Sequence, residues 1–408
     1  MLYELWQNFI HNLFKPLLLF FYFGFLIPIL KVRFEFPYVI YQGLTMYLLV
    51  AIGWQGGEEL AKVKPADIDN IAGFVVLGFV LNFVIGALTY FLLKYLTRLR
   101  RVDRATVAGY YGSDSAGTFA TCVAVLTSVG IAFDAYMPVL LAFMEIPGCL
   151  VALYLVARLR HRGMDEDGFM PDEPGYTAPA KVGPGAAVQR GRTEGLNEDA
   201  ERGIEEELEF SLERREHPEW YDDGRARTKA PLFSREILTE VFLNPGLILL
   251  VGGITIGFIS ALQGQKVVHD QNELFVAAFQ GVLCLFLLEM GMTASRKLRD
   301  LKLAGSGFII FGLVAPNLFA TLGILAAYSY AYFTDTHFQP GTYVLFAVLC
   351  GAASYITLPA VQRLGIPEAS PTLPLAASLG LTFSYTVTLG IPVYIEINRA
   401  IAHWFPGT

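Results

Sequence analysis

The chain has 408 residues, of which 54% are hydrophobic and 16% are charged, and its formal net charge is -7. Because globular proteins carry about 25% charged residues, this composition excludes an ordinary soluble domain and indicates a polytopic membrane protein. Almost half of the acidic residues lie between Asp165 and Asp223. The acidity therefore belongs to one segment, the net charge says little about partners, and no nucleic-acid partner is expected.

Ten apolar stretches along the chain are predicted to cross a lipid bilayer, which takes roughly 20 apolar residues; the first of them is shorter than this. We therefore predict an all-α polytopic membrane protein with ten transmembrane helices. The four cysteines all fall inside these stretches, where we interpret them as small packing residues. The predicted spans are Pro16–Leu30, Pro37–Gly56, Ile71–Leu96, Ala105–Val129, Tyr136–Val156, Leu238–Leu262, Leu274–Met292, Ser306–Phe333, Tyr343–Leu364 and Thr372–Ile397.

A long hydrophilic insertion, about Arg158 to Arg235, separates the fifth span from the sixth. Its Gly-, Pro- and Ala-rich part, Pro179–Ala187, cannot form a packed core and is predicted to be disordered. Asn197–Arg215 begins with an N-cap residue and has apolar residues at helical spacing, which predicts a surface helix. This helix is either a solvated linker or a docking site for a soluble regulator. The predicted domains are a first five-span repeat (1–157), the acidic insertion (158–235) and a second five-span repeat (236–408).

The loops on the two sides of the predicted spans differ in charge. The side that joins span one to two, three to four, five to six, seven to eight and nine to ten carries most of the Lys and Arg residues, among them Arg98, Arg100 and Arg101. By the positive-inside rule this side faces the cytoplasm. We therefore predict a multi-pass protein of the plasma (inner) membrane, with both termini outside and the insertion in the cytoplasm.

The two halves of the chain share a pattern. Trp54–Lys64 follows the second span and Met290–Leu298 follows the seventh, and each precedes a span rich in Gly and aromatic residues. Because the two copies are five spans apart and five is odd, the second copy must be inverted relative to the first. The sequence thus predicts two inverted five-helix repeats, a common transporter architecture.

The fourth span is interrupted by Gly109–Thr118, a run with three glycines, two serines, a threonine and Asp114. A charged side chain at the bilayer centre costs at least ~2.5–3.5 kcal/mol. Unwound backbone is tolerated at that depth only where it faces protein or a water-filled cavity. We therefore predict a discontinuous helix here, the kind of place where transporters bind their substrate.

The ninth span has a corresponding interruption, Gly351–Pro359. Pro359 removes a backbone donor and clashes with the preceding turn, which predicts a break near Ser354–Leu358. Two half-helix N-termini that face each other offer partial positive charge and free N–H donors, an arrangement that suits an anion with several oxygens. The alternative is that these Gly and Ser residues only allow close helix packing.

Three acidic residues lie at membrane depth. Asp114 lies in the first break, and we predict that it couples transport to a cation or a proton. Glu145, beside Pro147, has either a coupling role or a structural role as the partner of a polar group on a neighbouring helix. Glu289, near the end of span seven, is interpreted as reaching the interface. All six histidines lie outside the spans, so no histidine relay or metal cage is indicated, and no cofactor is predicted.

At these motifs the sequence resembles the SbtA-type sodium-dependent bicarbonate transporters of cyanobacteria and their bacterial relatives. The residues that carry the resemblance are Arg101–Thr106 with the break after it, Phe143–Pro147, the break in span nine, and Arg363–Pro367. The resemblance implies a homotrimer of 5+5 inverted repeats, with a core domain that moves against a scaffold domain. It also implies bicarbonate between the two broken helices beside a sodium ion, and regulation by a soluble PII-like trimer at the cytoplasmic face.

The chain departs from the family pattern at several positions in the breaks, among them Ala352, Ala353 and Leu358, and two further departures exchange a carboxylate. Tyr355 stands where the family has an Asp, and Asp114 stands where the family usually has an apolar residue. Either Asp114 replaces the missing sodium ligand, or sodium coupling is lost, or the substrate is not bicarbonate. The residues predicted to bind the substrate are Gly112, Ser113, Ser115, Gly117, Thr118, Ser354, Tyr355 and Thr357, and those predicted to couple the cation are Asp114 and Glu145, with sodium at Asp114.

The leading hypothesis is a secondary active transporter of a small inorganic anion, namely sodium-coupled bicarbonate uptake by alternating access. The first alternative is a carrier of a different small anion or a proton-coupled carrier. The second is a non-transporting membrane receptor that signals through the insertion. An enzyme is not expected, because the sequence shows no metal-binding His pair, no nucleophile with a plausible base and no cofactor fingerprint.

Overall fold

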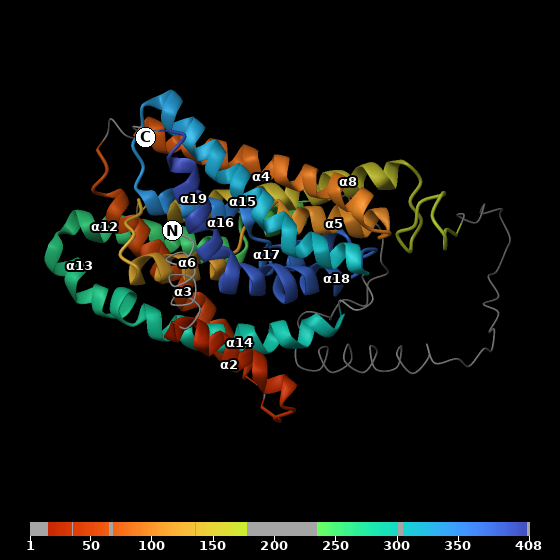
Figure 1. The fold of residues 1–408 in the computed structure, drawn as a ribbon, viewed down its shortest axis with the longest axis horizontal. Coiled ribbons are helices and arrows are strands. Elements are labelled where there is room, and N and C mark those ends of the chain that lie inside the picture. The colour runs from red at the N-terminus through yellow and green to blue at the C-terminus, as the bar shows by residue number, and fades with distance from the viewer. Residues whose placement is uncertain are drawn as a thin grey trace. The chain divides into compact units, whose positions relative to one another are not determined.

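The computed structural model describes residues 15–34, 36–64, 68–134, 136–177, 235–300 and 305–405 (Figure 1). Within these ranges the regular structure is helical and no strand occurs. The described residues belong to one compact unit, and a second unit, Ala178–Pro231, lies outside them. The predicted disordered stretch, Pro179–Ala187, and the predicted surface helix, Asn197–Arg215, therefore also lie outside the described residues.

Each predicted span contains at least one helix, and several spans contain two. The first half has α2 (Pro16–Ile29), α3 (Tyr38–Leu60), α4 (Ile68–Leu96), α5 (Arg101–Tyr111), α6 (Ala116–Ser128), α7 (Met137–Met144) and α8 (Ile146–His161). The second half has α11 (Arg235–Phe242), α12 (Pro245–Gln263), α13 (Gln265–Asn272), the π-helical turn η2 (Glu273–Ala277), α14 (Phe279–Asp300), α15 (Ser306–Thr334), α16 (Pro340–Gly351), α17 (Thr357–Gly365), α18 (Leu373–Leu375), the π-helical segments η4 (Ala376–Phe383) and η5 (Thr386–Gly390), and α19 (Ile391–Ala402).

Several of these helices have the length and composition of membrane spans. Within the described part of the chain, six stretches are long and apolar enough to cross a bilayer, whereas α2 and α16 are apolar but shorter. The chain therefore has the helices of a multi-pass membrane protein. The six stretches are Ile68–Leu96, Met137–His161, Pro245–Gln263, Val267–Leu298, Ser306–Thr334 and Leu373–Ala402.

The prediction that the sixth span begins at Leu238 is wrong. The short helix α11 ends at Phe242, and a separate helix, α12, begins at Pro245. Asn244 is the N-cap of α12, and its side chain accepts a hydrogen bond of 2.8 Å from the Leu247 N–H. Pro245 favours this separation, because proline disfavours helical backbone at the residue before it and has no N–H to donate to the preceding turn.

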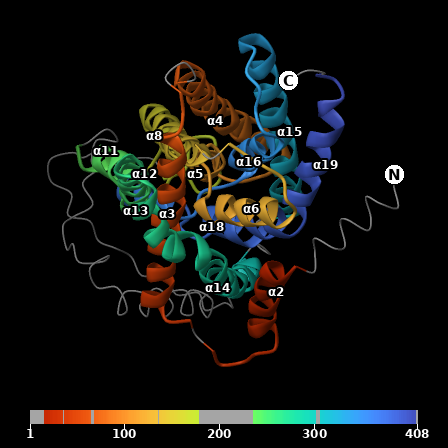
Figure 2. The same cartoon turned by 90° about the vertical axis from the view of Figure 1, so that its left-hand side faces the viewer.

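Two pairs of helices pack backbone against backbone at glycines. α3 packs against α12, and a Cβ atom at Gly57 would lie 2.0 Å from the Ile254 carbonyl oxygen. α2 packs against α14, where a Cβ at Gly24 would lie 1.9 Å from the Leu288 carbonyl oxygen. Small residues allow such close approach between membrane helices. Figures 1 and 2 show α14 alongside α2.

The half-helices at the two predicted breaks lie inside the remaining helices. All residues of α16 from Gly341 to Gly351 are buried, and α6 is buried over most of its length. α16 packs against α15, α19 and α6, and α5 packs against α4 and α8 (Figure 2). A buried position is required of irregular backbone at membrane depth, because no lipid group can satisfy its polar atoms.

Residues 162–177, the beginning of the predicted insertion, contact the N-terminal end of α5. The guanidinium of Arg100 donates a hydrogen bond of 2.7 Å to the Asp167 carbonyl oxygen. The N–H of Arg101 donates a hydrogen bond of 2.8 Å to the Glu173 carboxylate. We call residues 162–177 the strap. It joins the start of the insertion to the helix that leads into the first break.

Candidate functional site

The first predicted break is a four-residue interruption between two helices. α5 ends at Tyr111 and α6 begins at Ala116, so residues 112–115 are not helical. Ser115 is the N-cap of α6, and its Oγ accepts hydrogen bonds from the Thr118 N–H at 3.2 Å and from Thr118 Oγ1 at 2.8 Å. This cap satisfies one N–H of the first turn. The N–H groups of Ala116 and Gly117 have no partner within the helix.

The second predicted break is hydrogen-bonded directly to the first half-helix. α16 ends at Gly351 and α17 begins at Thr357. Between them, the Ser354 N–H donates a hydrogen bond of 2.8 Å to the carbonyl oxygen of Tyr110 in α5. The hydroxyl of Ser378, in η4, donates to the Ser354 carbonyl oxygen at 2.7 Å. The two interruptions are therefore neighbours in space, although more than 200 residues separate them in the sequence.

A third interruption lies at Glu145, between α7 and α8, where the sequence predicted only a disturbed helix. Pro147 follows it and cannot donate to the carbonyl one turn earlier. The side chain of Asn82, in α4, donates to the Met144 carbonyl oxygen at 2.9 Å. Ser113 Oγ, in the first break, donates to the Glu145 carbonyl oxygen at 2.7 Å. The backbone of this interruption is thus held by the first break and by α4.

The carboxylate of Glu145 faces the N-terminal end of α17. Its Oε1 accepts a hydrogen bond from Oγ1 of Thr357, the first residue of that helix. A carboxylate at a helix N-terminus is stabilised by the positive end of the helix dipole. This contact is the structural role that the sequence offered as the alternative to coupling. It also means that the positive end of α17 already has an acidic partner.

Asp114 is buried without a hydrogen-bond partner. The residue is 1% exposed, and neither carboxylate oxygen has a partner among the described residues. The charged group that acts on it electrostatically is another acid, Glu145. A buried polar atom left unsatisfied costs about 1–3 kcal/mol, and more when it is charged. An unpartnered acid at this depth is therefore a candidate ion-binding group.

Tyr355 covers the N-terminal end of α6. A Cβ atom at Gly117 would lie 2.1 Å from the Tyr355 hydroxyl oxygen and 2.9 Å from the ring of Phe286. The hydroxyl lies beside the Ser115 side chain and the Gly117 N–H, although neither contact has the geometry of a full hydrogen bond. Glycine at position 117 thus makes room for a phenol at the helix end that carries the free N–H groups.

The other two glycines of the first break pack tightly. A Cβ at Gly112 would lie 3.0 Å from the Gly86 Cα in α4, and one at Gly109 would lie 2.6 Å from the Ala152 Cβ in α8. The Gly112 N–H donates to the Ala108 carbonyl oxygen at 2.9 Å. These are the contacts of close-packing residues, so Gly112 shapes the break, and its predicted contact with substrate stays a prediction.

Glu289 lies in α14 on a face that is turned toward the second break. It is partly buried, and its Oε1 accepts a hydrogen bond of 2.7 Å from Thr293 Oγ1. Its charge acts on Tyr355 and is itself influenced by Arg296. The Glu289 carboxylate therefore has two kinds of neighbour. Thr293 and Tyr355 lie inside the protein, and Arg296 lies toward the end of α14, where the sequence predicted that Glu289 reaches the membrane interface.

Three residues that the sequence did not single out complete the site. Asn82 and Ser378 are fully buried polar residues whose side chains hold backbone at the interruptions. Asn82 and Ser378 could have been found in the sequence, because each is a polar residue inside an apolar span. Phe286, which covers Gly117, gives no such signal, because phenylalanine is common in every span.

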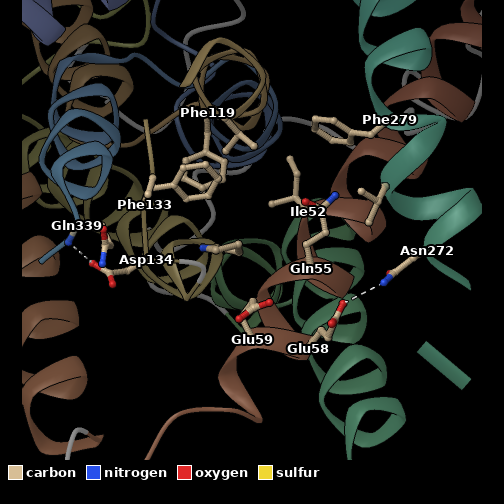
Figure 3. A pocket seen from close by; sticks show the side chains of 14 residues that line it. Ile52, Gln55, Glu58, Glu59, Phe119, Phe133, Asp134, Asn272, Phe279 and Gln339 are labelled. Carbon is tan, nitrogen blue, oxygen red and sulfur yellow. Dashed lines mark hydrogen bonds between the residues drawn. The ribbon is translucent and has the colours of Figure 1, made fainter. Parts of the chain in front are cut away.

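A cavity of about 740 Å³ lies beside this site (Figure 3). It is lined by the C-terminal part of α3, the loop before α7, and parts of α6, α13 and η2. Figure 3 shows the carboxylates of Glu58 and Glu59 on one side of the cavity and the side chains of Ile52 and Phe119 on the other. Because Phe119 belongs to the first turns of α6, the cavity reaches the helix whose N-terminus lies in the first break.

The structure brings most of the predicted site residues together at one place. Ser113 and Thr357 both bond to Glu145, Ser354 bonds to α5, and Tyr355 lies against Gly117 beside the Ser115–Thr118 cap. In the searched part of the described chain, no group of three or more His, Cys, Asp or Glu side chains is arranged to hold a metal ion. The site combines free N–H donors, which suit an anion, with an unpartnered carboxylate, which suits a cation.

The chain was compared with known protein families and with curated proteins. A family model described as the Na+-dependent bicarbonate transporter superfamily matches residues 16–399. No curated protein matches the chain. The match extends over both predicted halves, including the three interruptions and the cavity, and it confirms the resemblance found in the sequence.

Proposed function

Because the chain belongs to the Na+-dependent bicarbonate transporter superfamily, a family of transporters and not of enzymes, we propose that it takes up bicarbonate together with sodium by alternating access. The observation that supports this most is the N-terminal end of α6. There, N–H groups of the first turn that have no partner within the helix lie next to a buried carboxylate, Asp114, that no other described residue hydrogen-bonds. An anion and a cation can therefore be held side by side.

In this proposal the anion binds to the end of α6. The N–H groups of Ala116 and Gly117 donate to its oxygens, and the positive end of the helix dipole stabilises its charge. The buried hydroxyl of Ser354, which has no partner among the described residues, and that of Tyr355, beside Ser115 and Gly117, serve as further donors. The remaining predicted residues hold this end in shape: Gly112, Ser113, Ser115 and Thr118 in the first break and Thr357 in the second.

Sodium makes the anion site usable. Bicarbonate at the end of α6 lies near Asp114, and two like charges a few ångströms apart in a poorly solvated site repel by several kcal/mol. A sodium ion on the unpartnered Asp114 carboxylate removes this repulsion. The carboxylate supplies the oxygen ligands that hard cations prefer. Binding of the anion therefore depends on binding of the cation, which is the basis of coupling.

The finer architecture follows the family and the interruptions. We propose discontinuous fourth and ninth helices in two inverted five-span repeats, 1–157 and 236–408, flanking the cytoplasmic insertion 158–235. The pairs α2–α14 and α3–α12 act as the scaffold against which the other helices move. We further propose a homotrimer in the plasma (inner) membrane, with both termini outside and a soluble PII-like regulator at the cytoplasmic face.

Uptake of labelled bicarbonate into liposomes tests this function. Purified protein in liposomes should accumulate the label when an inward sodium gradient is applied, and not when potassium replaces sodium. Uptake driven by a proton gradient alone would favour the proton-coupled carrier. Saturable binding of bicarbonate without any flux would contradict transport and favour the receptor hypothesis.

A further inference from the structure

Two cavities share one lining residue, which belongs to α3. The larger cavity, of about 740 Å³, extends from the carboxylates of Glu58 and Glu59 to Ile52 (Figure 3). The smaller, of about 10 Å³, is lined by Ile52 together with Ala116 and Gly117. Ile52 is the residue that lines both, and among the described residues no other lines the two cavities.

The two cavities differ in what they can hold. The smaller has room for about one water molecule beside Ala116 and Gly117, which is too little for bicarbonate. The larger has room for ions with their hydration water. Ile52 is 3% exposed and lines both, and Phe286 and Ile356 form other walls of the smaller cavity.

We infer that the larger cavity is the entrance to the anion site and that Ile52 is the gate between them. The route runs from the ends of α3 and α6, past Ile52, to the first turn of α6. The gate belongs to α3, one of the helices packed through glycines, whereas the N–H groups belong to the first break. A small movement of the glycine-packed helices relative to the helices of the first break therefore opens or closes the route. This inference rests on the proposed function only in naming the anion that uses the route.

The charges at the entrance determine which probe reaches the gate. Glu58, Glu59 and Asp134 line the larger cavity, and no Lys or Arg is among its described lining residues. Lys62 nearby pairs with Glu58 and Glu59, so it balances part of this charge. A cleft lined mainly by one sign of charge concentrates the opposite ion. A small cationic thiol reagent, methanethiosulfonate ethylammonium, is therefore suited to enter.

Cysteine labelling tests the gate on the purified full-length protein. Gln55→Cys places a thiol in the larger cavity, and Leu48→Cys places one in the smaller cavity, behind Ile52. We expect Gln55→Cys to react at least about tenfold faster than Leu48→Cys, the ratio given by a barrier difference of ~1.4 kcal/mol. In the Ile52→Ala background the Leu48→Cys thiol should react about tenfold faster than with Ile52 present. The wild-type protein, with its four native cysteines, gives the background rate.

Two further variants protect the test. If Ile52→Ala does not fold, Ile52→Val replaces it in the test. This variant removes one carbon and should also accelerate labelling of Leu48→Cys, by a smaller factor. In the transport assay, Ile52→Trp should block uptake, whereas Met46→Trp, at a half-exposed position of α3 that lines neither cavity, should not.

Two results would overturn the inference: equal labelling rates at positions 48 and 55 with Ile52 in place, or no acceleration in both Ile52→Ala and Ile52→Val. The labelling needs neither bicarbonate nor sodium. Absence of uptake with an intact labelling pattern would therefore refute the proposed substrate and leave the gate standing.

Discussion

Two acids beside the breaks have different surroundings. Glu145 accepts a hydrogen bond from Thr357 at the start of α17, so its charge is held by a helix N-terminus. Asp114 has no partner among the described residues on either oxygen. The carboxylate of Glu145 therefore has a structural contact, whereas that of Asp114 has oxygens that can coordinate a cation. This difference is why we assign the sodium ion to Asp114.

Asp114→Asn should uncouple transport from sodium. The amide keeps the size of the side chain but removes the charge that binds the cation, so sodium-driven bicarbonate uptake should fall at least about tenfold, the loss that corresponds to ~1.4 kcal/mol of binding. The measurement is initial uptake into liposomes as a function of sodium concentration. Asp172→Asn is the matched control, because Asp172 is an exposed partner of Arg101 and exposed ion pairs contribute little. Unchanged sodium dependence in Asp114→Asn would contradict the assignment.

The strap depends on the ionised form of Asp165. Burial raises the pKa of this carboxyl, but hydrogen bonds from the N–H groups of Thr177, Phe169 and Asp167 lower it by more, and the pKa lies below its ordinary value. Because the folded pKa is lower than the unfolded one, the contact stabilises the strap at pH values above the unfolded pKa, about 3.9. This stabilisation is lost as the pH falls through the folded pKa.

Asp165→Asn should loosen the strap at neutral pH, in the same way that protonation of Asp165 at low pH loosens it in the wild-type protein. We expect a local loss of about 1.5–3 kcal/mol, the range for hydrogen bonds to a charged group. Amide hydrogen exchange over residues 165–177 measures this loss, and in the variant it should depend less on pH below about 4. Glu166→Gln, at an exposed neighbouring position, is the control. Equal exchange in both variants would show that Asp165 does not hold the strap.

Among the helices, the glycine contacts between α3 and α12 give the sharpest test of packing. A Cβ at Gly257 would lie 2.2 Å from the Trp54 carbonyl oxygen, so Gly257→Ala must push the helices apart. Overpacking of this kind costs about 1–3 kcal/mol, and the thermal unfolding midpoint in detergent should fall. Gly252→Ala, on the same helix, meets no atom within 4 Å and should leave the midpoint unchanged or slightly higher. A similar fall in both variants would contradict this account, because Gly252 has no close neighbour that an added methyl group could displace.

The interruptions show which parts of the site could be predicted from sequence. The helix ends at Tyr111 and Gly351 fall inside the two stretches that were singled out, because glycine, polar residues and proline act on the backbone locally. The bond between Ser354 and Tyr110 and the position of Tyr355 against Gly117 depend on contacts between distant parts of the chain. Local patterns carry no information on such contacts, so they could not be predicted.

Element boundaries failed where a local signal was weighed too lightly. The sixth span was predicted to begin at Leu238, although Asn244 and Pro245 together are a strong helix-start signal. The structure begins α12 at Pro245. Apolar residues continue on both sides of this point. A prediction from hydropathy alone therefore merged two helices that the N-cap Asn244 and Pro245 separate.

At the scale of the whole molecule, the account joins two sets of helices. One set contains the pairs α2–α14 and α3–α12 and carries Ile52 and Phe286, which face the end of α6. The other contains the three interruptions, Asp114 and Glu145. The proposed substrate site on one set and the proposed gate on the other would together give a physical basis for alternating access, because relative movement of the sets would change whether the larger cavity reaches the site.

The strap gives the insertion a mechanical connection to this movement. It is hydrogen-bonded to Arg100 and Arg101 at the start of α5, and α5 ends at the first break. A partner that binds the insertion can therefore act on the site through a single short helix. This connection is consistent with the proposed regulator at the cytoplasmic face.

The most direct test of the central claim is a cryo-EM map of the protein in sodium bicarbonate, compared with a map in potassium chloride. The account predicts anion density within hydrogen-bond distance of the Ala116 and Gly117 N–H groups, and cation density at the Asp114 carboxylate, in the first map only. Bicarbonate density elsewhere, with the end of α6 still covered by Tyr355 and Asp114 bare in both maps, would contradict it.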